Sequence, residues 1–189
     1  MSNLNNSIDQ VCGCLYVMPV EQNHIHKGCL FESSGILPSL AYGEKSISRI
    51  VTPLENYIHF MNLSLASEGG TLSIKLIEDV TILTPGTLAI PTPYKNLNRN
   101  STNTIETLIY RSPTYSGGTT LRTFPIHGST TNQAVSNGSF VESANTSIVL
   151  KNGQTDYILE VENIDQDEDT AYNIGLVNII CESAVGLVE

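Results

Sequence analysis

The residue types best suited to chemistry gather near the start of the chain. Residues 1–30 hold three of the four cysteines and two of the four histidines: Cys12, Cys14, Cys29, His24 and His26. Thiolates and imidazoles are common zinc ligands, and a structural zinc site takes four of them in a tetrahedron. The Cys-x-Cys spacing differs from that of the common zinc fingers. We therefore predict no metal site and keep these five residues only as zinc candidates.

Two further interpretations of the cysteines remain open. The first ten residues lack the basic start of a secretory signal, so we expect the chain to fold in a reducing cytoplasm. Its cysteines would begin as thiols. Cys29 could later form a disulfide with a cysteine near the N-terminus, or all four could stay inert, which is the interpretation we favour.

The other polar clusters suggest structure rather than catalysis. Residues 165–169 carry four carboxylates but lack the glycine and the distal glutamate of an EF-hand, which favours a solvated loop. His59 and His127 fall within or at the end of expected strands. The chain has no Gly-x-Ser-x-Gly, Walker or His-Glu-x-x-His motif. We predict no catalytic residue, no cofactor and no enzymatic activity.

A third candidate is the segment Asn98, Arg99 and Asn100, which enters an expected strand from a loop. Asparagine tolerates left-handed turn conformations, and a planar guanidinium can bind several carbonyl groups or a carboxylate at once. We interpret the three residues as a structural clamp that holds this loop on the fold. The alternative is that Arg99 contacts a neighbouring subunit.

The elements that must position these residues are short strands. Only 15% of residues are charged, against about 25% in typical globular proteins, and the polar residues are largely Asn, Ser and Thr. No window has a helical apolar stripe. Some eight strands predict an all-β, antiparallel β-sandwich of jelly-roll-like form. They are expected at residues 46–51, 57–66, 71–78, 102–111, 119–126, 147–150, 157–162 and 172–181.

One pair of strands has a clear turn between its members. Residues 57–66 and 71–78 flank Glu68-Gly69-Gly70, which predicts a hairpin. In the first strand, alternation places Ile58 and Phe60 on one face and Met61, Leu63 and Leu65 on the other. The residues expected in the core are Phe60, Leu63, Leu65, Leu72, Ile74, Leu76, Leu121, Leu159, Val161, Ile174 and Leu176.

Composition also divides the chain. Residues 1–30 show no sustained period and are interpreted as an N-terminal arm or small subdomain, while 31–189 form the sandwich domain. The arm is apolar at Cys14-Leu15-Tyr16-Val17-Met18, so we expect these side chains to be buried against a neighbouring molecule. The formal net charge of −10 argues against binding nucleic acid, which requires Lys and Arg.

From about Leu30 to Glu182, the order of these elements resembles a family of small all-β virion proteins of tailed bacteriophages. Of the motifs that carry the likeness, Leu97-Asn98-Arg99-Asn100-Ser101 is the distinctive one. The others are Phe31, Ile50-Val51-Thr52-Pro53, Ser67-Glu68-Gly69, Leu76-Ile77-Glu78-Asp79, Pro85-Gly86-Thr87, Gly118-Thr119, Leu150-Lys151-Asn152, Tyr157-Ile158-Leu159-Glu160-Val161 and the segment 173–182.

The resemblance implies a non-enzymatic structural protein of the virion: a capsid decoration or auxiliary protein on the outside of the head that stabilises contacts between capsomers. It further implies the major capsid protein as partner, a homo-oligomer with a trimer favoured, and neither nucleic-acid nor membrane binding. Two alternatives stay open. One is a tail or fibre-base protein of the same virion. The other is a carbohydrate-binding sandwich on the particle surface, for which the loop tyrosines Tyr94 and Tyr115 are suggestive.

Overall fold

The structure, a computed structural model, describes residues 25–89, 93–127, 136–139, 148–166 and 170–183. Apart from a helical turn at 25–27, these residues form strands and loops, and no described helix has the length and apolar character to cross a membrane. The strands are β1 (Leu30–Ile36), β2 (Leu40–Ala41), β3 (Lys45–Val51), β4 (Tyr57–Glu68), β5 (Thr71–Glu78), β6 (Thr81–Thr84), β7 (Thr87–Leu88), β8 (Tyr94–Asn96), β9 (Leu108–Arg111), β10 (Thr114–Ser116), β11 (Thr119–His127), β12 (Ser136–Ser139), β13 (Ile148–Leu150), β14 (Asp156–Asn163) and β15 (Thr170–Ser183).

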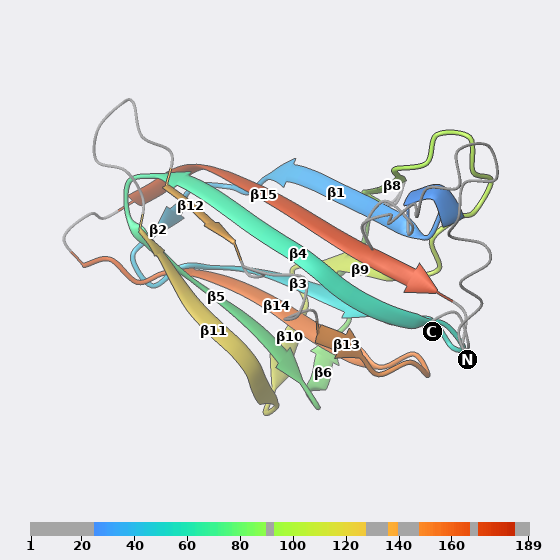
Figure 1. Cartoon of the computed structure of the whole chain (residues 1–189). Coiled ribbons are helices and arrows are strands. Elements are labelled where there is room, and N and C mark those ends of the chain that lie inside the picture. The colour runs from blue at the N-terminus through green and yellow to red at the C-terminus, as the bar shows by residue number, and fades with distance from the viewer. Residues whose placement is uncertain (1–24, 90–92, 128–135, 140–147, 167–169, 184–189) are drawn as a thin grey trace, which may run out of the picture.

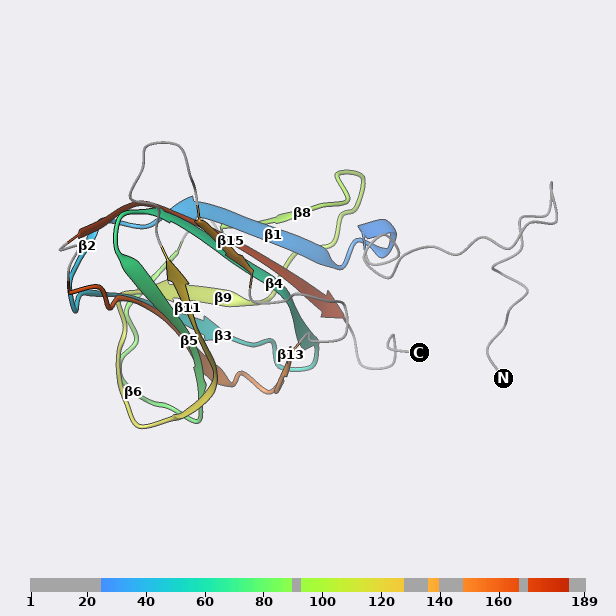
Figure 2. The ribbon, with the colours of Figure 1, turned by 60° about the vertical axis from the view of Figure 1, so that its left-hand side comes forward.

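Two large antiparallel sheets face each other (Figure 1), and β6 and β10 pair separately as a two-stranded antiparallel ribbon, called the β6–β10 ribbon. The first, called the β15 sheet, has the order β12-β4-β15-β1-β8, and β13 and β2 also pair with β4 and β15. The second, called the β14 sheet, has the order β11-β5-β14-β3-β9-β7. The turned view separates the two layers (Figure 2). This arrangement confirms the predicted all-β antiparallel sandwich.

The pairing order is that of a jelly roll. The first long strand pairs with the last (β1 with β15), the next inward pair is β3 with β14, and then come β4 with β12 and β13, and β5 with β11. The chain is therefore one long antiparallel hairpin whose nested pairs alternate between the two sheets. Double-sheet jelly rolls of this kind are built from two Greek keys.

The core lies between the sheets. The predicted core residues Leu63, Leu65, Leu72, Ile74, Leu76, Leu159, Val161 and Ile174 are all buried there. Leu121 and Leu176 are partly buried and pack against the same cluster. The side chain of Phe60 lies outside what the structure describes. Period-two alternation therefore identified most of the interior.

The structure corrects the predicted hairpin between β4 and β5. Gly69 and Gly70 both have positive φ, 66° and 65°, but the strands that they join belong to different sheets and do not pair. The turn thus carries the chain across the sandwich. A Cβ on Gly70 would come within 3.0 Å of Ala171 Cβ and Asn163 Oδ1, so close packing as well as φ requires glycine there.

The expected faces of β4 also need correction. Ile58, Leu63 and Leu65 are all buried in the core, although strict alternation would place Ile58 opposite the other two. The register against β15 shifts between Phe60 and Asn62, so Met61 is an extra residue, a β-bulge. The extra residue shifts the alternation by one position, so that Ile58 before it and Leu63 and Leu65 after it all point into the core. A separate correction concerns the strand expected over residues 102–111. The observed strand, β9, begins only at Leu108.

Candidate functional site

Most of the zinc candidates lie outside the described residues: Cys12, Cys14 and His24. Of the other two, His26 is exposed and Cys29 is buried. Across the described ranges, no group of three or more His, Cys, Asp or Glu side chains could hold a metal ion.

The described partner of Cys29 is Cys181. Their Sγ atoms are 3.1 Å apart, and they pack with Leu30, Ile25 and Leu97 in a small apolar cluster beside the main core. The hydrogen bond with Cys29, together with burial, raises the pKa of the Cys181 thiol. Because the thiolate is the reactive form of cysteine, a raised pKa makes this pair slow to react.

Asparagine side chains hold the loop that contains the predicted clamp. Asn98 Nδ2 donates to the His26 carbonyl at 3.1 Å, and Asn98 Oδ1 accepts from the Asn100 backbone N–H at 3.0 Å. Asn96 and Asn103 both donate to the Gly28 carbonyl, at 2.9 and 3.2 Å. The loop 96–103 is thereby tied to residues 26–28.

Arg99 itself projects from this loop into solvent. Its side chain is exposed and makes no hydrogen bond or ion pair with any residue that the structure describes. The asparagines, rather than the guanidinium, make the contacts expected of a clamp. For Arg99 the alternative of a contact with a neighbouring subunit stays a prediction.

The remaining sequence candidates are dispersed. Asp165 accepts a hydrogen bond from Thr71 Oγ1 at 2.9 Å, and residues 167–169 of the acidic run lie outside the described ranges. The Thr71 hydroxyl also lies 3.3 Å from His127 Nδ1. Nothing is described for the side chain of His59. These contacts fix the start of β5 to the end of β11 and to the residues that follow β14.

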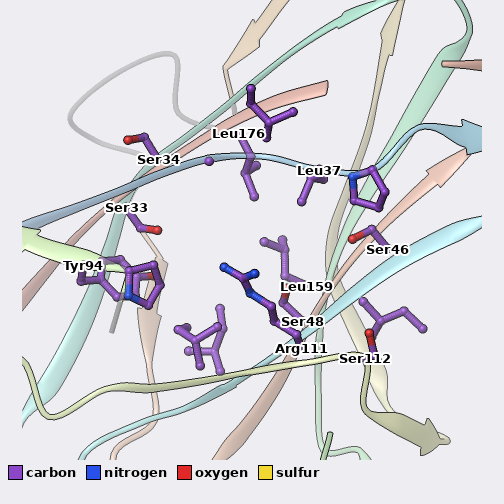
Figure 3. Close-up of a pocket in the computed structure, with 17 residues that line it drawn as sticks. Ser33, Ser34, Leu37, Ser46, Ser48, Tyr94, Arg111, Ser112, Leu159 and Leu176 are labelled. Atoms are coloured by element: carbon purple, nitrogen blue, oxygen red, sulfur yellow. The ribbon is translucent and has the colours of Figure 1, made fainter. Parts of the chain in front are cut away.

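The structure points instead to a cavity that sequence reasoning missed. It occupies about 220 Å³ between the two sheets, where β1 and β8 of the β15 sheet face β3 and β9 of the β14 sheet. Its floor is apolar and includes Ile50, Ile109, Leu159 and Leu176. Serine side chains, one tyrosine and one arginine complete the lining (Figure 3).

The cavity exists because inward positions carry small polar residues. On β3, the buried Ile50 faces the core, so Ser46 and Ser48 face inward with it by alternation. On β1, the buried Phe31 places Ser33 and Gly35 on the inner face in the same way. Positions that would usually hold large apolar side chains therefore leave space between the sheets.

Arg111 projects into this space. It pairs with Ser48 across β9 and β3, which places both side chains on the inner face. Figure 3 shows its guanidinium in the middle of the cavity, between Ser33 and Tyr94 on one side and Ser46 on the other. No described residue forms a hydrogen bond or ion pair with this guanidinium. It is a positive charge that the described fold leaves unmatched.

The cavity opens between two incompletely paired strand edges. β8 pairs only with Phe31–Ser33 of β1, and none of the described strands lies beside the edge of β1 beyond Ser33 on that side. On the facing sheet, the pairing of β9 with β3 covers Ser48–Val51, and one further hydrogen bond, from the Ser112 N–H to the Ile47 carbonyl at 3.0 Å, extends it. Ile36, 81% exposed, stands at the rim. Solvent and small molecules therefore have a route to Arg111.

A polar network on the outer face of the β14 sheet contrasts with this open site. Glu160 of β14, with a side chain only 4% exposed, accepts hydrogen bonds from Lys45 and Lys75, both at 3.1 Å, and from the Tyr115 hydroxyl at 2.8 Å. Glu162 adds a second carboxylate, 3.0 Å from Lys75 Nζ. Here the charges are matched, and Tyr115 ties the β6–β10 ribbon to the sheet.

The pKa values of this network follow from its contacts. Burial alone would raise the pKa of Glu160, but the hydrogen bonds from Tyr115, Lys75 and Lys45 outweigh it and lower that pKa below its usual value. Burial and the bond to Glu160 raise the pKa of Tyr115 to about 12. Both shifts favour a charged Glu160 and a neutral Tyr115 at neutral pH, as expected of a structural network.

Comparison with known proteins adds no assignment: a scan against models of protein families finds no match to this chain, and neither does a search of curated proteins.

Proposed function

We propose that this protein is a non-enzymatic structural protein of a bacteriophage virion, a decoration or auxiliary protein on the outer surface of the head. In this role it binds the major capsid protein and stabilises contacts between capsomers. It acts as a homo-oligomer, with a trimer favoured.

The observation that carries the proposal is the nested jelly-roll order of the strands, β1 with β15 through to β5 with β11. Double-sheet jelly rolls recur in viral capsid proteins, and also in lectins and cupins. A fold shared so widely does not select one function. The likeness to phage virion proteins in the order of elements, and the surface properties below, favour the capsid role.

Charge favours an outward position in the particle. The chain carries nine basic and nineteen acidic residues, a formal net charge of −10. A protein that faced packaged DNA would be repelled by the phosphates, because phosphate binding is built from Lys and Arg. On the outer surface the same charge keeps the subunit soluble until it meets the shell.

One end of the sandwich has features suited to contact with a shell. Ile25, the first described residue, packs beside Cys181 near the end of β15, so the described chain starts at this end of the sandwich. We propose that the N-terminal arm anchors the subunit. Leu54 and Val149 are 61% and 53% exposed here. Val149 lies in β13, and the loop that follows β13 is joined to the loop of Leu54, since the Leu54 carbonyl accepts a hydrogen bond from the Gly153 N–H at 3.1 Å.

The test is quantitative analysis of purified particles of the phage that encodes the chain. Decoration predicts hundreds of copies per particle, in a shell of density outside the capsid in a cryo-electron-microscopy map. About a dozen copies or fewer, located at the tail, would instead support the tail or fibre-base alternative. Complete absence from particles would refute both.

A pair of matched variants tests which end meets the shell. Leu54→Asp should reduce occupancy on stripped particles at least tenfold, because it places a charge in the proposed contact. Ile164→Asp changes a similarly exposed residue beside Thr71, at the opposite end, and should leave occupancy unchanged. Equal occupancy for both variants would contradict the proposed orientation.

The second candidate function is carbohydrate binding, which the inter-sheet cavity favours. Lectins share this fold, and the cavity combines hydroxyl groups with an apolar floor and Tyr94. The structure corrects the expectation that Tyr94 and Tyr115 lie in loops: Tyr94 is in β8 and only 6% exposed, and Tyr115 is in β10. The two functions are compatible in one protein, since a subunit on a particle surface can also bind a host glycan.

A further inference from the structure

We propose that the cavity between the sheets binds a sugar acid, meaning a monosaccharide unit that carries one carboxylate, with Arg111 as the anion-binding residue. This inference rests on the carbohydrate-binding alternative and not on the capsid role. It concerns the isolated subunit, so its failure and the failure of the capsid assignment are separate results.

Arg111 indicates the charge of the ligand. Its guanidinium projects between the sheets and meets no carboxylate among the described residues, whereas Lys45, Arg49, Lys75 and Lys151 all have acidic partners. Arg111 is exposed through the opening of the cavity, so water solvates its charge in the free protein. A ligand that excluded this water without supplying an anionic group would leave the charge unpaired, which is costly. A guanidinium binds a carboxylate in bidentate geometry, which satisfies both its charge and its donors.

The remaining lining indicates a hydroxylated body. Ser33, Ser46 and Ser48 line the cavity from both sheets, and each hydroxyl can donate and accept hydrogen bonds. A purely aliphatic acid would leave these groups without partners when it displaced water. A sugar offers hydroxyls to them and C–H groups to the apolar floor at Ile109 and Leu159.

The size of the cavity agrees with one sugar unit. A dry cavity of about 150 Å³ holds benzene, and pockets for drug-sized ligands begin at about 300 Å³. The present 220 Å³ falls between these limits. Because the opening lies at the strand edges, the unit could be the end or a branch of a longer acidic glycan.

The experiment is isothermal titration calorimetry of the full chain with sodium D-glucuronate and, as a neutral control, D-glucose. Glucuronate should bind, and glucose should bind at least tenfold more weakly because it lacks the carboxylate. Arg111→Gln should reduce glucuronate affinity at least tenfold, while Arg99→Gln, which removes another unpaired exposed arginine, should leave it unchanged.

A second variant, Gly35→Leu, keeps the proposal testable if Arg111→Gln does not fold. A Cβ at Gly35 meets no atom within 4 Å, so Gly35→Leu should fill the cavity without disturbing the backbone and should also abolish binding. Circular dichroism and the urea midpoint establish that each variant is folded. Absence of glucuronate binding by the wild-type chain, or binding that survives Arg111→Gln, would overturn the proposal. Benzoate or sulfate binding as tightly as glucuronate would also overturn it, because the serines would then not recognise a sugar.

Discussion

Removing the Tyr115 hydroxyl is the sharpest test of how the β6–β10 ribbon is held. Tyr115→Phe deletes a 2.8 Å hydrogen bond to Glu160 and leaves the aromatic ring in place, so it creates no cavity. Glu160 keeps two donors, Lys45 and Lys75, and is not left unsatisfied. The change therefore isolates one hydrogen bond to a charged group.

The magnitude follows from burial. Hydrogen bonds to charged groups contribute about 1.5–3 kcal/mol to stability. Tyr115 is half-buried, so water can replace part of the lost bond, and we expect a loss of about 1.5–2 kcal/mol at pH 7. Tyr42→Phe is the matched control, because the Tyr42 hydroxyl accepts a bond from Gln166 on the exposed surface, and it should cost less than about 0.5 kcal/mol.

The same variant makes a prediction about pH. The folded-state pKa of Glu160 lies below its unfolded value, so its stabilisation is present above the unfolded pKa of about 4.3 and is lost as pH falls through the folded pKa. The difference between wild type and Tyr115→Phe should therefore be larger at pH 7 than at pH 3.

Urea unfolding at both pH values measures this difference, and native-state hydrogen exchange reports whether β6 and β10 open locally. A double-mutant cycle with Glu160→Gln separates the pairwise interaction from other effects. Equal stability of Tyr115→Phe and wild type at pH 7, with unchanged exchange in the ribbon, would refute the conclusion that this bond holds the ribbon on the sheet.

Three other outcomes are expected. Leu63→Ala should lower the free energy of unfolding by about 2–5 kcal/mol in urea titrations, because the side chain is fully buried between the sheets. Asn98→Ala should lower the thermal midpoint because it removes the hydrogen bond to the His26 carbonyl, whereas Arg99→Ala should leave the midpoint unchanged. The opposite result would show that Arg99, and not Asn98, holds the loop. Cys29 and Cys181 should react with iodoacetamide only slowly in the native protein and rapidly in urea, and fast native labelling would contradict their burial.

The sequence predicts the fold class and most of the core because alternation in β5 and β14 is regular. Leu72, Ile74 and Leu76 are inward in one strand, and Leu159 and Val161 in the other. Short apolar runs between turns are sufficient to indicate such strands. Which strands pair is a property of the whole chain, and this is why a glycine turn that resembles a hairpin turn could instead cross between sheets.

The candidate site could not be predicted for a related reason. In β3, Ser46, Ile47 and Ser48 alternate, and polarity alone would place the isoleucine inward. The register with β14 and the burial of Ile50 place the serines inward instead. A one-residue change of register exchanges the two faces of a strand, so the cavity and the direction of Arg111 depend on pairings that local sequence does not specify.

The central position of β15 has a consequence for synthesis of the protein. β15 lies between β1 and β4 and pairs with both, and Cys29 meets Cys181 across 152 positions of sequence. During translation, the edges of β1 and β4 that pair with β15 therefore stay unpaired until nearly the whole chain has left the ribosome. Contacts so distant in sequence slow folding, and open edges invite pairing with other chains. Chains truncated before residue 170 lack β15 and should therefore aggregate rather than form a partial sandwich.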